Sequence, residues 1–184
     1  MSSDLESPWR EFLQELDALL DEPFSLHCIG GFAAVAGYGL PRNTNDLDYR
    51  SVVPGNRVAD LQKIAGPGSA LARKHKVHLQ HTGVESIPEG YEERVTELFA
   101  TQFNRLRLFI PDPYDLILSK LTRNIARDRA DVQFLAKAKN LDACILRERS
   151  VRELRPIVIG PEERHDATLD FWIAAYFTHD PENS

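Results

Sequence analysis

The sequence predicts an α+β protein with a mixed α/β first part and a helical second part. Two observations carry this expectation. Before residue 112, short apolar runs of strand length recur between turn-forming residues. After Pro113, apolar residues recur at helical spacing almost to the C-terminus. We therefore expect residues 1–112 to form an α/β core, and residues 113–184 to form a helical part packed on that core in one compact unit.

The first part should begin with a helix. Ser7 offers a capping hydroxyl and Pro8 suits the first helical position, and apolar residues then recur at helical spacing until Pro23 ends the helix. The run at 66–68, Gly-Pro-Gly, marks a later break. The further elements expected in this part are a strand at 24–29, a helix at 32–38, a strand at 46–53, a helix at 57–64, and strands at 76–81 and 105–110.

The second part should contain helices only. One or two helices are expected over 114–140, another over 141–153 and a last one over 161–177. Trp172, Tyr176 and Phe177 lie on the last helix and are expected to pack in the core or between helices. The Pro-Asp-Pro corner at 111–113 is the expected boundary between the two parts.

Composition indicates an ordinary globular protein. The chain has 184 residues, of which 42% are hydrophobic and 27% charged, and its net charge is −6. A surface that binds nucleic acid throughout is more often basic, so any such contact should be local. The basic run at 73–76 is the best local patch in the first part, although a solvated loop is the expectation there. Cys28 and Cys144 are expected to be small buried residues without a disulfide bond. The N-terminus lacks a signal-peptide pattern and no run is long enough to span a membrane, which predicts a cytoplasmic protein.

Two carboxylates stand one residue apart in the strand expected at 46–53. Asp46 and Asp48 should point to the same face of that strand, with Leu47 and Tyr49 on the other face. Carboxylates held together repel one another unless a cation lies between them. Mg²⁺ prefers oxygen ligands and is often held by one or two carboxylates plus substrate phosphates. The pair therefore predicts a metal site.

A glycine pair precedes these carboxylates. Gly30 and Gly31 follow an expected strand and open an expected helix, where glycine lets the backbone approach a ligand and the helix start favours a phosphate. Arg42 and Thr44 lie just before the carboxylates and are expected to contact or order the same site. Either signal alone is common in turns and solvated loops, whereas the two in this order and spacing are specific.

With these motifs in place, the segment 27–50 resembles the nucleotidyltransferase superfamily, which has the polymerase-β-like fold. The resemblance covers most of residues 24–140. The resemblance implies a small mixed sheet flanked by helices and an NTP as substrate. It implies that Gly30 and Gly31 hold the triphosphate, and that Asp46 and Asp48 bind Mg²⁺ or Mn²⁺ and act in catalysis.

The helical half adds a second likeness. The run DLILSKLTRNIARDRADVQFL, residues 115–135, resembles the helical motifs of abortive-infection-type toxin nucleotidyltransferases and their uncharacterised relatives. In those families a lysine on one helix is followed by an Asp-rich element. Lys120 matches the lysine, and Asp128 and Asp131 match the acidic element. The resemblance thus implies a catalytic role for Lys120 and Asp131.

Spacing gives this second motif separate support. On one continuous helix, Lys120, Asn124, Arg127 and Asp131 would share a single face. Lys120 and Arg127 would then bind the nucleotide by neutralising phosphate charge. A salt-bridged solvent face is the competing interpretation, and a helix break near Asn124 would remove the one-face argument.

The sequence departs from the superfamily pattern at two places. Phe32 stands where many relatives have a small hydroxyl residue that touches the triphosphate. The strand expected to carry a third carboxylate offers His78 and Gln80 instead. A neutral imidazole binds Mg²⁺ less well than a carboxylate does. His78 either substitutes for the carboxylate or marks a loss of activity. Zinc at His75, His78 and His81 is disfavoured, because their spacing fits neither strand nor helix and no cysteine joins them.

The function expected from the sequence is metal-dependent transfer of a nucleotide from an NTP to an acceptor. RNA, protein and small molecules are all candidate acceptors, and the toxin-like motifs favour tRNA or protein over a small molecule. A toxin role with an antitoxin partner follows from the same resemblance. The alternative is a catalytically weak or inactive relative that binds a nucleotide or a partner protein.

Overall fold

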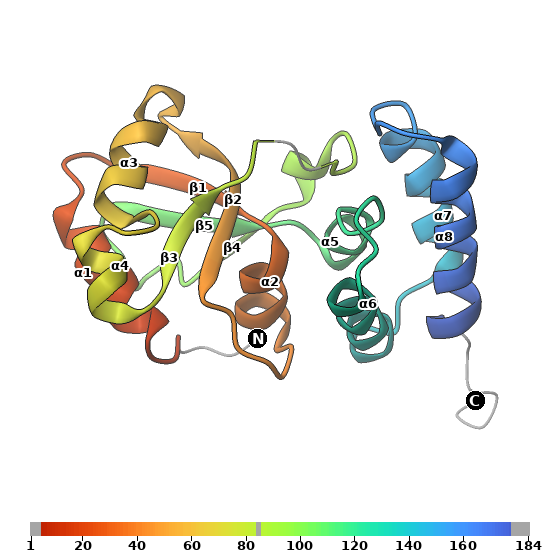
Figure 1. Cartoon of the computed structure of the whole chain (residues 1–184), viewed down its shortest axis with the longest axis horizontal. Helices are drawn as coiled ribbons and strands as arrows, with labels where there is room; N and C mark the ends of the chain where they lie inside the picture. Colours follow the sequence, from red (N-terminus) through yellow and green to blue (C-terminus); the bar gives the residue numbers. More distant parts are fainter. Residues whose placement is uncertain (1–4, 84–85, 178–184) are drawn as a thin grey trace. The chain divides into compact units, whose positions relative to one another are not determined.

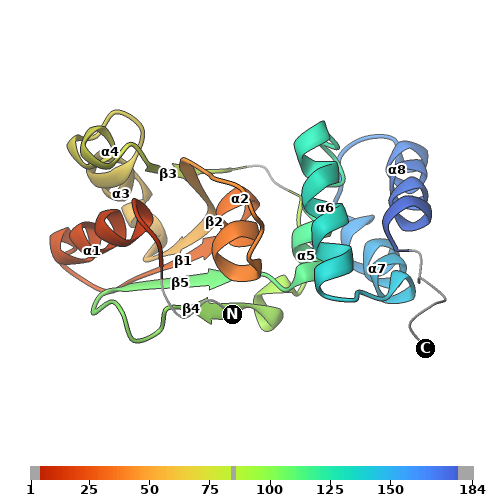
Figure 2. The ribbon, with the colours of Figure 1, turned by 90° about the horizontal axis from the view of Figure 1, so that it is seen from below.

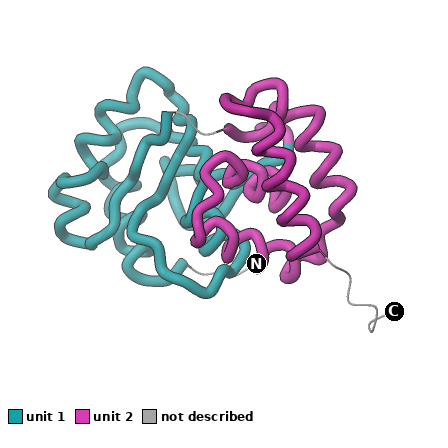
Figure 3. The backbone as a smooth tube through the Cα atoms, turned by 45° about the vertical axis from the view of Figure 1, so that its right-hand side comes forward, with its two compact units in different colours: residues 1–85, 94–111 teal, residues 86–93, 112–184 magenta. Residues whose placement is uncertain are grey.

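A computed structural model describes residues 5–83 and 86–177 and divides the chain into two compact units (Figure 3). Unit 1 comprises Met1–Glu85 and Arg94–Pro111, and unit 2 comprises Ser86–Glu93 and Asp112–Ser184. Unit 1 holds a mixed sheet flanked by helices, and the C-terminal half of the chain is helical. These features confirm the predicted fold class.

Unit 1 is built on a five-stranded sheet with the strand order β3-β2-β1-β5-β4 (Figure 1). Strand β1 is antiparallel to β2 and parallel to β5, β2 is parallel to β3, and β4 is antiparallel to β5, so the sheet is mixed. The strands are β1 Phe24–Cys28, β2 Asp46–Val53, β3 His78–His81, β4 Thr96–Leu98 and β5 Leu106–Ile110. The helices are α1 Trp9–Leu19, α2 Gly30–Phe32 with a π-helical turn Ala33–Gly37, α3 Val58–Ala65 after a 3₁₀ turn Gly55–Arg57, and α4 Ala70–His75.

One face of this sheet forms the core of unit 1. Helices α1, α3 and α4 gather on the same side of the sheet (Figures 1 and 2). Leu47, Tyr49 and Leu79 are fully buried, and the amide of Gln62 on α3 donates a 2.8 Å hydrogen bond to the Tyr49 hydroxyl. The alternating side chains of β2, which are half-buried, therefore point to the opposite face.

Several elements of unit 1 differ from the sequence expectation. The strands at 24–29, 46–53 and 105–110 and the helix at 57–64 are confirmed to within a residue or two. Ser7 does not cap α1, since its hydroxyl instead donates a 2.6 Å bond to Glu11 and Pro8 occupies the capping position. The basic run at 73–76 is not a loop but the end of α4, whose start is capped by Ser69. The short strand β4 was not expected.

Unit 2 is helical in its described part. It contains α5 Pro113–Leu118, α6 Ala126–Ala138, α7 Ala143–Arg149 with a π-helical continuation Ser150–Leu154, and α8 Glu162–Tyr176, while the segment Ser86–Glu93 contributes a 3₁₀ turn that begins at Tyr91. Of the one or two helices expected over 114–140, the structure has two, α5 and α6. Asn124 adopts a left-handed φ of 45°, which an α-helix does not accommodate, and its side chain accepts a 3.3 Å bond from the indole N–H of Trp172. Trp172 is fully buried, which confirms its predicted place in the core.

Two further expectations concern single residues and the membrane. Cys28 is buried and Cys144 is exposed, and neither forms a disulfide bond. The prediction of a buried residue is therefore confirmed for Cys28 and wrong for Cys144, which lies in the first turn of α7. Within the described ranges, none of the helices combines the length and the apolar character needed to cross a membrane.

Candidate active site

The two carboxylates of β2 define one end of the site. Asp46 and Asp48 alternate with the buried side chains of Leu47 and Tyr49, so both lie on the sheet face opposite α3. The register of β2 against β1 shifts just beyond them, with Arg50 as the extra residue of a β-bulge. Bulges of this kind are frequent beside active sites, where they redirect side chains. The prediction that both residues lie on one face of the strand is confirmed.

The glycine pair lies directly against these carboxylates. The backbone N–H of Ile29 donates a 2.8 Å bond to the carbonyl of Asp48, which places the end of β1 beside β2. Gly30 has a φ of 64°, and a Cβ atom at this position would lie 2.5 Å from Oδ2 of Asp48. Both the conformation and the space therefore require glycine here. The backbone of the turn approaches the Asp48 carboxylate more closely than any other residue type would allow.

Arg42 and Thr44 lie over the second glycine. A Cβ atom at Gly31 would lie 3.0 Å from Nη2 of Arg42 and 3.0 Å from Oγ1 of Thr44. The Thr44 hydroxyl is 2.7 Å from Oδ1 of Asp46, to which it donates. The structure thus brings together all six residues that the sequence assigned to unit 1 for nucleotide and metal binding. They are Gly30, Gly31, Arg42, Thr44, Asp46 and Asp48.

Trp9 supports this arrangement and was not singled out from the sequence. Its indole N–H donates a 3.2 Å bond to the carbonyl of Thr44, which ties the start of α1 to the loop before β2. The only signal in the sequence was an aromatic residue on an apolar helix stripe, a pattern that does not distinguish a core residue from a supporting one. Trp9 is 8% exposed, which is consistent with a fixed position beneath the loop.

Phe32, the departure noted after the glycine pair, is a core residue. Its ring is 1% exposed and meets the Trp9 ring edge-on with 5.0 Å between centroids. The side chain therefore packs in the core and helps to hold α2 against α1. Phe32 therefore helps to fix the glycine turn through its packing on Trp9.

The neighbouring strand carries no carboxylate beside the pair. In the parallel register, His78 lies opposite Asp46 and Gln80 lies opposite Asp48. Residues in register share a face, so His78 and Gln80 face the same way as the carboxylates. Among residues 5–83 and 86–177, no group of three or more His, Cys, Asp or Glu side chains is arranged to hold a metal ion.

The three histidines considered for zinc point to different partners. Nε2 of His75 lies 2.8 Å from a carboxylate oxygen of Glu15, whereas the His81 ring lies against Tyr49 with 5.2 Å between centroids. His75 belongs to α4, and His78 and His81 belong to β3.

The carboxylate pair fits a hard divalent cation. Two carboxylates on one sheet face, with a glycine turn packed beside them, match the way Mg²⁺ is commonly held by one or two carboxylates plus substrate phosphates. The packing of Gly30 against Asp48 is the observation that joins the two halves of such a site.

Lys120 and Asp131 form a buried ion pair in unit 2. Nζ of Lys120 lies 3.0 Å from Oδ2 of Asp131 and 3.9 Å from Oδ1 of Asp128, and all three side chains are at most 3% exposed. Asp128 also accepts two hydrogen bonds from the guanidinium of Arg123, at 2.6 and 2.9 Å. This network fastens α6 to the turn after α5. The pair therefore has a structural role in the geometry seen here, and its predicted catalytic role stays a prediction.

Arg127 does not join Lys120 on a common face. The helix break at Asn124 separates α5 from α6, and Arg127 is exposed in the first turn of α6 while Lys120 is buried. The single-face argument for Lys120, Asn124, Arg127 and Asp131 is therefore wrong. Spacing alone could not reveal this, because both halves of the run have helical periodicity.

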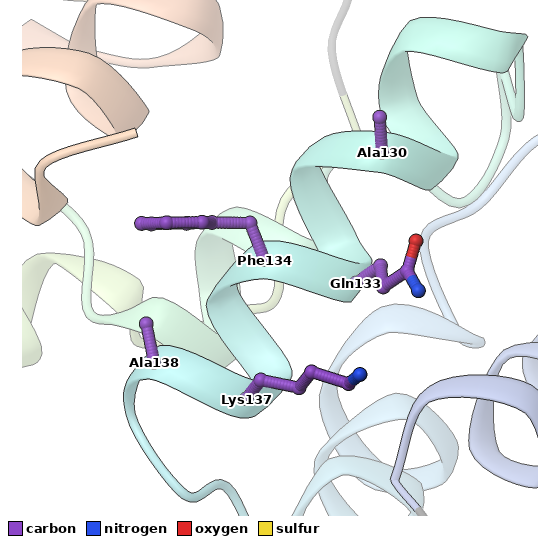
Figure 4. Close-up of a pocket in the computed structure, with 5 residues that line it drawn as sticks. All are labelled: Ala130, Gln133, Phe134, Lys137 and Ala138. Carbon is purple, nitrogen blue, oxygen red and sulfur yellow. The ribbon is translucent and has the colours of Figure 1, made fainter. Parts of the chain in front are cut away.

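A shallow hollow on α6 is the other feature of unit 2 near these residues (Figure 4). It has a volume of about 460 Å³ and contains none of the predicted site residues. Phe134 and Ala138 point to one side of the helix, and Gln133 and Lys137 point to the other. A single helix with one cation offers no convergent chemistry, so the candidate site is that of unit 1.

A small mixed sheet with an Asp-x-Asp pair against a Gly-Gly turn is the arrangement of the nucleotidyltransferase class. Comparison with family profiles agrees. The profile described as "Nucleotidyltransferase of unknown function (DUF6036)" matches residues 10–177, most of the chain. The protein belongs to this family. Comparisons with curated proteins and with solved structures gave no match.

Proposed function

We propose that the protein transfers a nucleotide from an NTP to an acceptor, with Mg²⁺ or Mn²⁺ held by Asp46 and Asp48. The observation that carries the proposal is the packing of Gly30 against the Asp48 carboxylate. It makes the phosphate-binding turn and the metal-binding pair parts of one site. The family assignment supports the same class of reaction.

Each residue of the site has a defined task in this proposal. The Gly30–Gly31 turn lets phosphate oxygens approach the backbone, and the guanidinium of Arg42, which lies over Gly31, neutralises phosphate charge. The Thr44 hydroxyl holds the Asp46 carboxylate in place through its 2.7 Å hydrogen bond. When bound, the divalent ion supplies charge neutralisation at the triphosphate and at the leaving oxygen.

His78 is the proposed base. It lies opposite Asp46 on the neighbouring strand and faces the same side of the sheet, where the acceptor hydroxyl has to lose its proton. Imidazole is a common general base near neutral pH, so the absence of a neighbouring carboxylate does not by itself remove this function. Lys120 and Asp131 are left out of the proposed mechanism, because each is buried against the other.

We propose tRNA or protein as the acceptor, in preference to a small molecule, and a toxin role with an antitoxin partner. The support for this part is the likeness of residues 115–135 to the helical motifs of toxin-type nucleotidyltransferases. A binding-only protein is the second candidate function. It is favoured by one observation, the placement of His78 and Gln80 where an active relative has a carboxylate.

The test is transfer of label from each radiolabelled NTP to total tRNA and to cell lysate, with and without Mg²⁺. We expect incorporation by the wild-type protein with Mg²⁺ only, and a loss of about 10²-fold or more in D46N and D48N, because each lacks a charge that stabilises the transition state. D60N is the matched control, since Asp60 is an exposed carboxylate of α3 that pairs with Arg57. Full activity in D46N would refute the mechanism. Metal-independent nucleotide binding without transfer would support the binding-only candidate.

A further inference from the structure

A pocket of about 650 Å³ lies in unit 1 beside the glycine turn. Its volume is within the range of small-molecule sites, about 300–1,000 Å³. Trp9 and Phe99 line its sides, the small Ala36 lies on the π-helical turn after α2, and Asn43 and Asn45 belong to the loop before β2. None of these five residues has a ligand-binding role in the proposed function.

The pocket is continuous with the proposed phosphate site. Arg42 and Thr44 line it as well. The same Arg42 guanidinium lies over Gly31, and the same Thr44 hydroxyl holds Asp46. The pocket and the proposed phosphate site therefore share these two residues, so the pocket lies beside a ligand whose phosphates are on the Gly30–Gly31 turn.

The lining suits a planar ring with a polar edge. Aromatic and small apolar side chains accept the faces of a ring, and the exposed carboxamides of Asn43 and Asn45 can each donate and accept hydrogen bonds. Asn side chains recognise base edges in this way. Phe99 adopts a φ of 55°, which is uncommon for a bulky residue and is the kind of local strain found at ligand sites.

We propose that this pocket binds the nucleoside part of the NTP, with Asn43 and Asn45 as the residues that discriminate between bases. The inference rests on the proposed function, because it assumes that the triphosphate lies on the glycine turn. A base at the end of an RNA acceptor has the same chemistry as the base of the NTP. The experiment has to separate the two sources.

The experiment compares the Mg²⁺-dependent binding of each NTP with that of inorganic tripolyphosphate by titration calorimetry. Tripolyphosphate reports on the turn and the carboxylates alone, whereas an NTP reports on these and on the pocket. We expect the preferred NTP to bind the wild-type protein at least about tenfold more tightly, which corresponds to about 1.4 kcal/mol. The variant A36F fills the pocket with a ring, so this difference should disappear while the Kd for tripolyphosphate stays the same.

A second variant covers the case in which A36F fails to fold, as judged by circular dichroism. Asn45 is exposed at the mouth of the pocket, and its backbone carbonyl, which accepts from His78 N–H at 3.1 Å, is retained in N45A. We expect N45A to change the order of affinity among the four NTPs without changing the affinity for tripolyphosphate.

Failure of the proposed phosphate site and failure of the nucleoside pocket give different results. Tripolyphosphate that does not bind, or binds equally well to D48N, would remove the proposed phosphate site and this inference with it. Equal affinity of the wild-type protein for NTPs and tripolyphosphate would refute the nucleoside pocket alone. An A36F variant that binds NTPs normally but has a raised KM for an RNA acceptor would also refute the nucleoside pocket, because the base in the pocket would then belong to the acceptor.

Discussion

Replacement of Lys120 by methionine separates a structural role from a catalytic one. Lys120 is 3% exposed, and its ammonium group lies between the carboxylates of Asp131 and Asp128. Methionine fills most of the same volume without the charge, so the change removes the ion pair and leaves a negative charge at Asp131 without this partner. We expect K120M to destabilise unit 2.

The magnitude follows from the burial of the pair. An ion pair in water contributes about 0–1 kcal/mol, whereas removing one partner of a buried pair costs about 3–5 kcal/mol. Because Asp131 is 1% exposed and Asp128 is fully buried, the cost of removing one partner of a buried pair applies here. Asp128 keeps its two bonds from Arg123, so Asp131 accounts for most of the loss. The double variant K120M/D131N should recover much of it, because no buried charge is then left without this partner.

Urea unfolding followed by the fluorescence of Trp172 measures this loss. Trp172 is buried in unit 2, and a W9F background leaves it as the only tryptophan of the chain. K137A is the control, since Lys137 is exposed on α6, the helix that carries Asp131, and should change stability by less than about 0.5 kcal/mol. A K120M protein as stable as the control but unable to transfer nucleotide would refute the structural role and restore the catalytic one.

Three further predictions concern unit 1 and the thiols. Burial by itself raises the pKa of Asp17. Hydrogen bonds from the backbone N–H groups of residues 104–106 lower this pKa by more than burial raises it, so the net pKa is below its ordinary value. The stabilisation by the Asp17 carboxylate is complete above its unfolded-state pKa of about 3.9 and is lost as pH falls through the lower folded-state pKa. D17N should therefore cost about 1–3 kcal/mol of stability at pH 7. In acid-unfolding curves this cost should become progressively smaller below about pH 4. Burial raises the pKa of the Cys28 thiol, so Ellman's reagent should titrate one thiol, Cys144, in the native protein and two in denaturant, and rapid reaction of both in the native state would contradict the burial. G30A should lower nucleotide affinity and cost at least about 1–2 kcal/mol of stability, because a Cβ atom there meets a carboxylate at a positive φ; an unchanged melting temperature would show that the turn relaxes freely.

The sheet of unit 1 could be predicted largely from its residues, because strands bounded by Pro and Gly have clear ends. Strand β4 was missed, since three residues carry too little alternation to be detected. Helix α4 was missed although Ser69 caps it, because the basic residues in its last turn resembled a solvated loop. The break at Asn124, which the sequence left open, is accompanied by a contact with Trp172, 48 residues away along the chain, which no local pattern reveals.

The candidate site likewise has features that could be predicted from the sequence and features that depend on the tertiary fold. Asp46 and Asp48 could be placed on one face by strand alternation alone, and the glycine pair by its position after a strand. The support that Trp9 gives to Thr44, by contrast, joins residues 35 positions apart and depends on the tertiary fold. The pairing of Lys120 with Asp131 likewise requires the bend between α5 and α6, which the helical period of both segments concealed.

The segment Ser86–Glu93 belongs to unit 2 although unit 1 precedes and follows it in the chain. Ile87 and Tyr91 are buried, and the N–H of Glu89 bonds to the carbonyl of Glu153 at 3.0 Å. The chain therefore passes from one unit to the other three times. A single recombination event between genes cannot transfer either unit intact, and a cut after Pro111 leaves this segment on the wrong fragment. The two units should be inherited together, and neither is a module that evolution could have exchanged in one step.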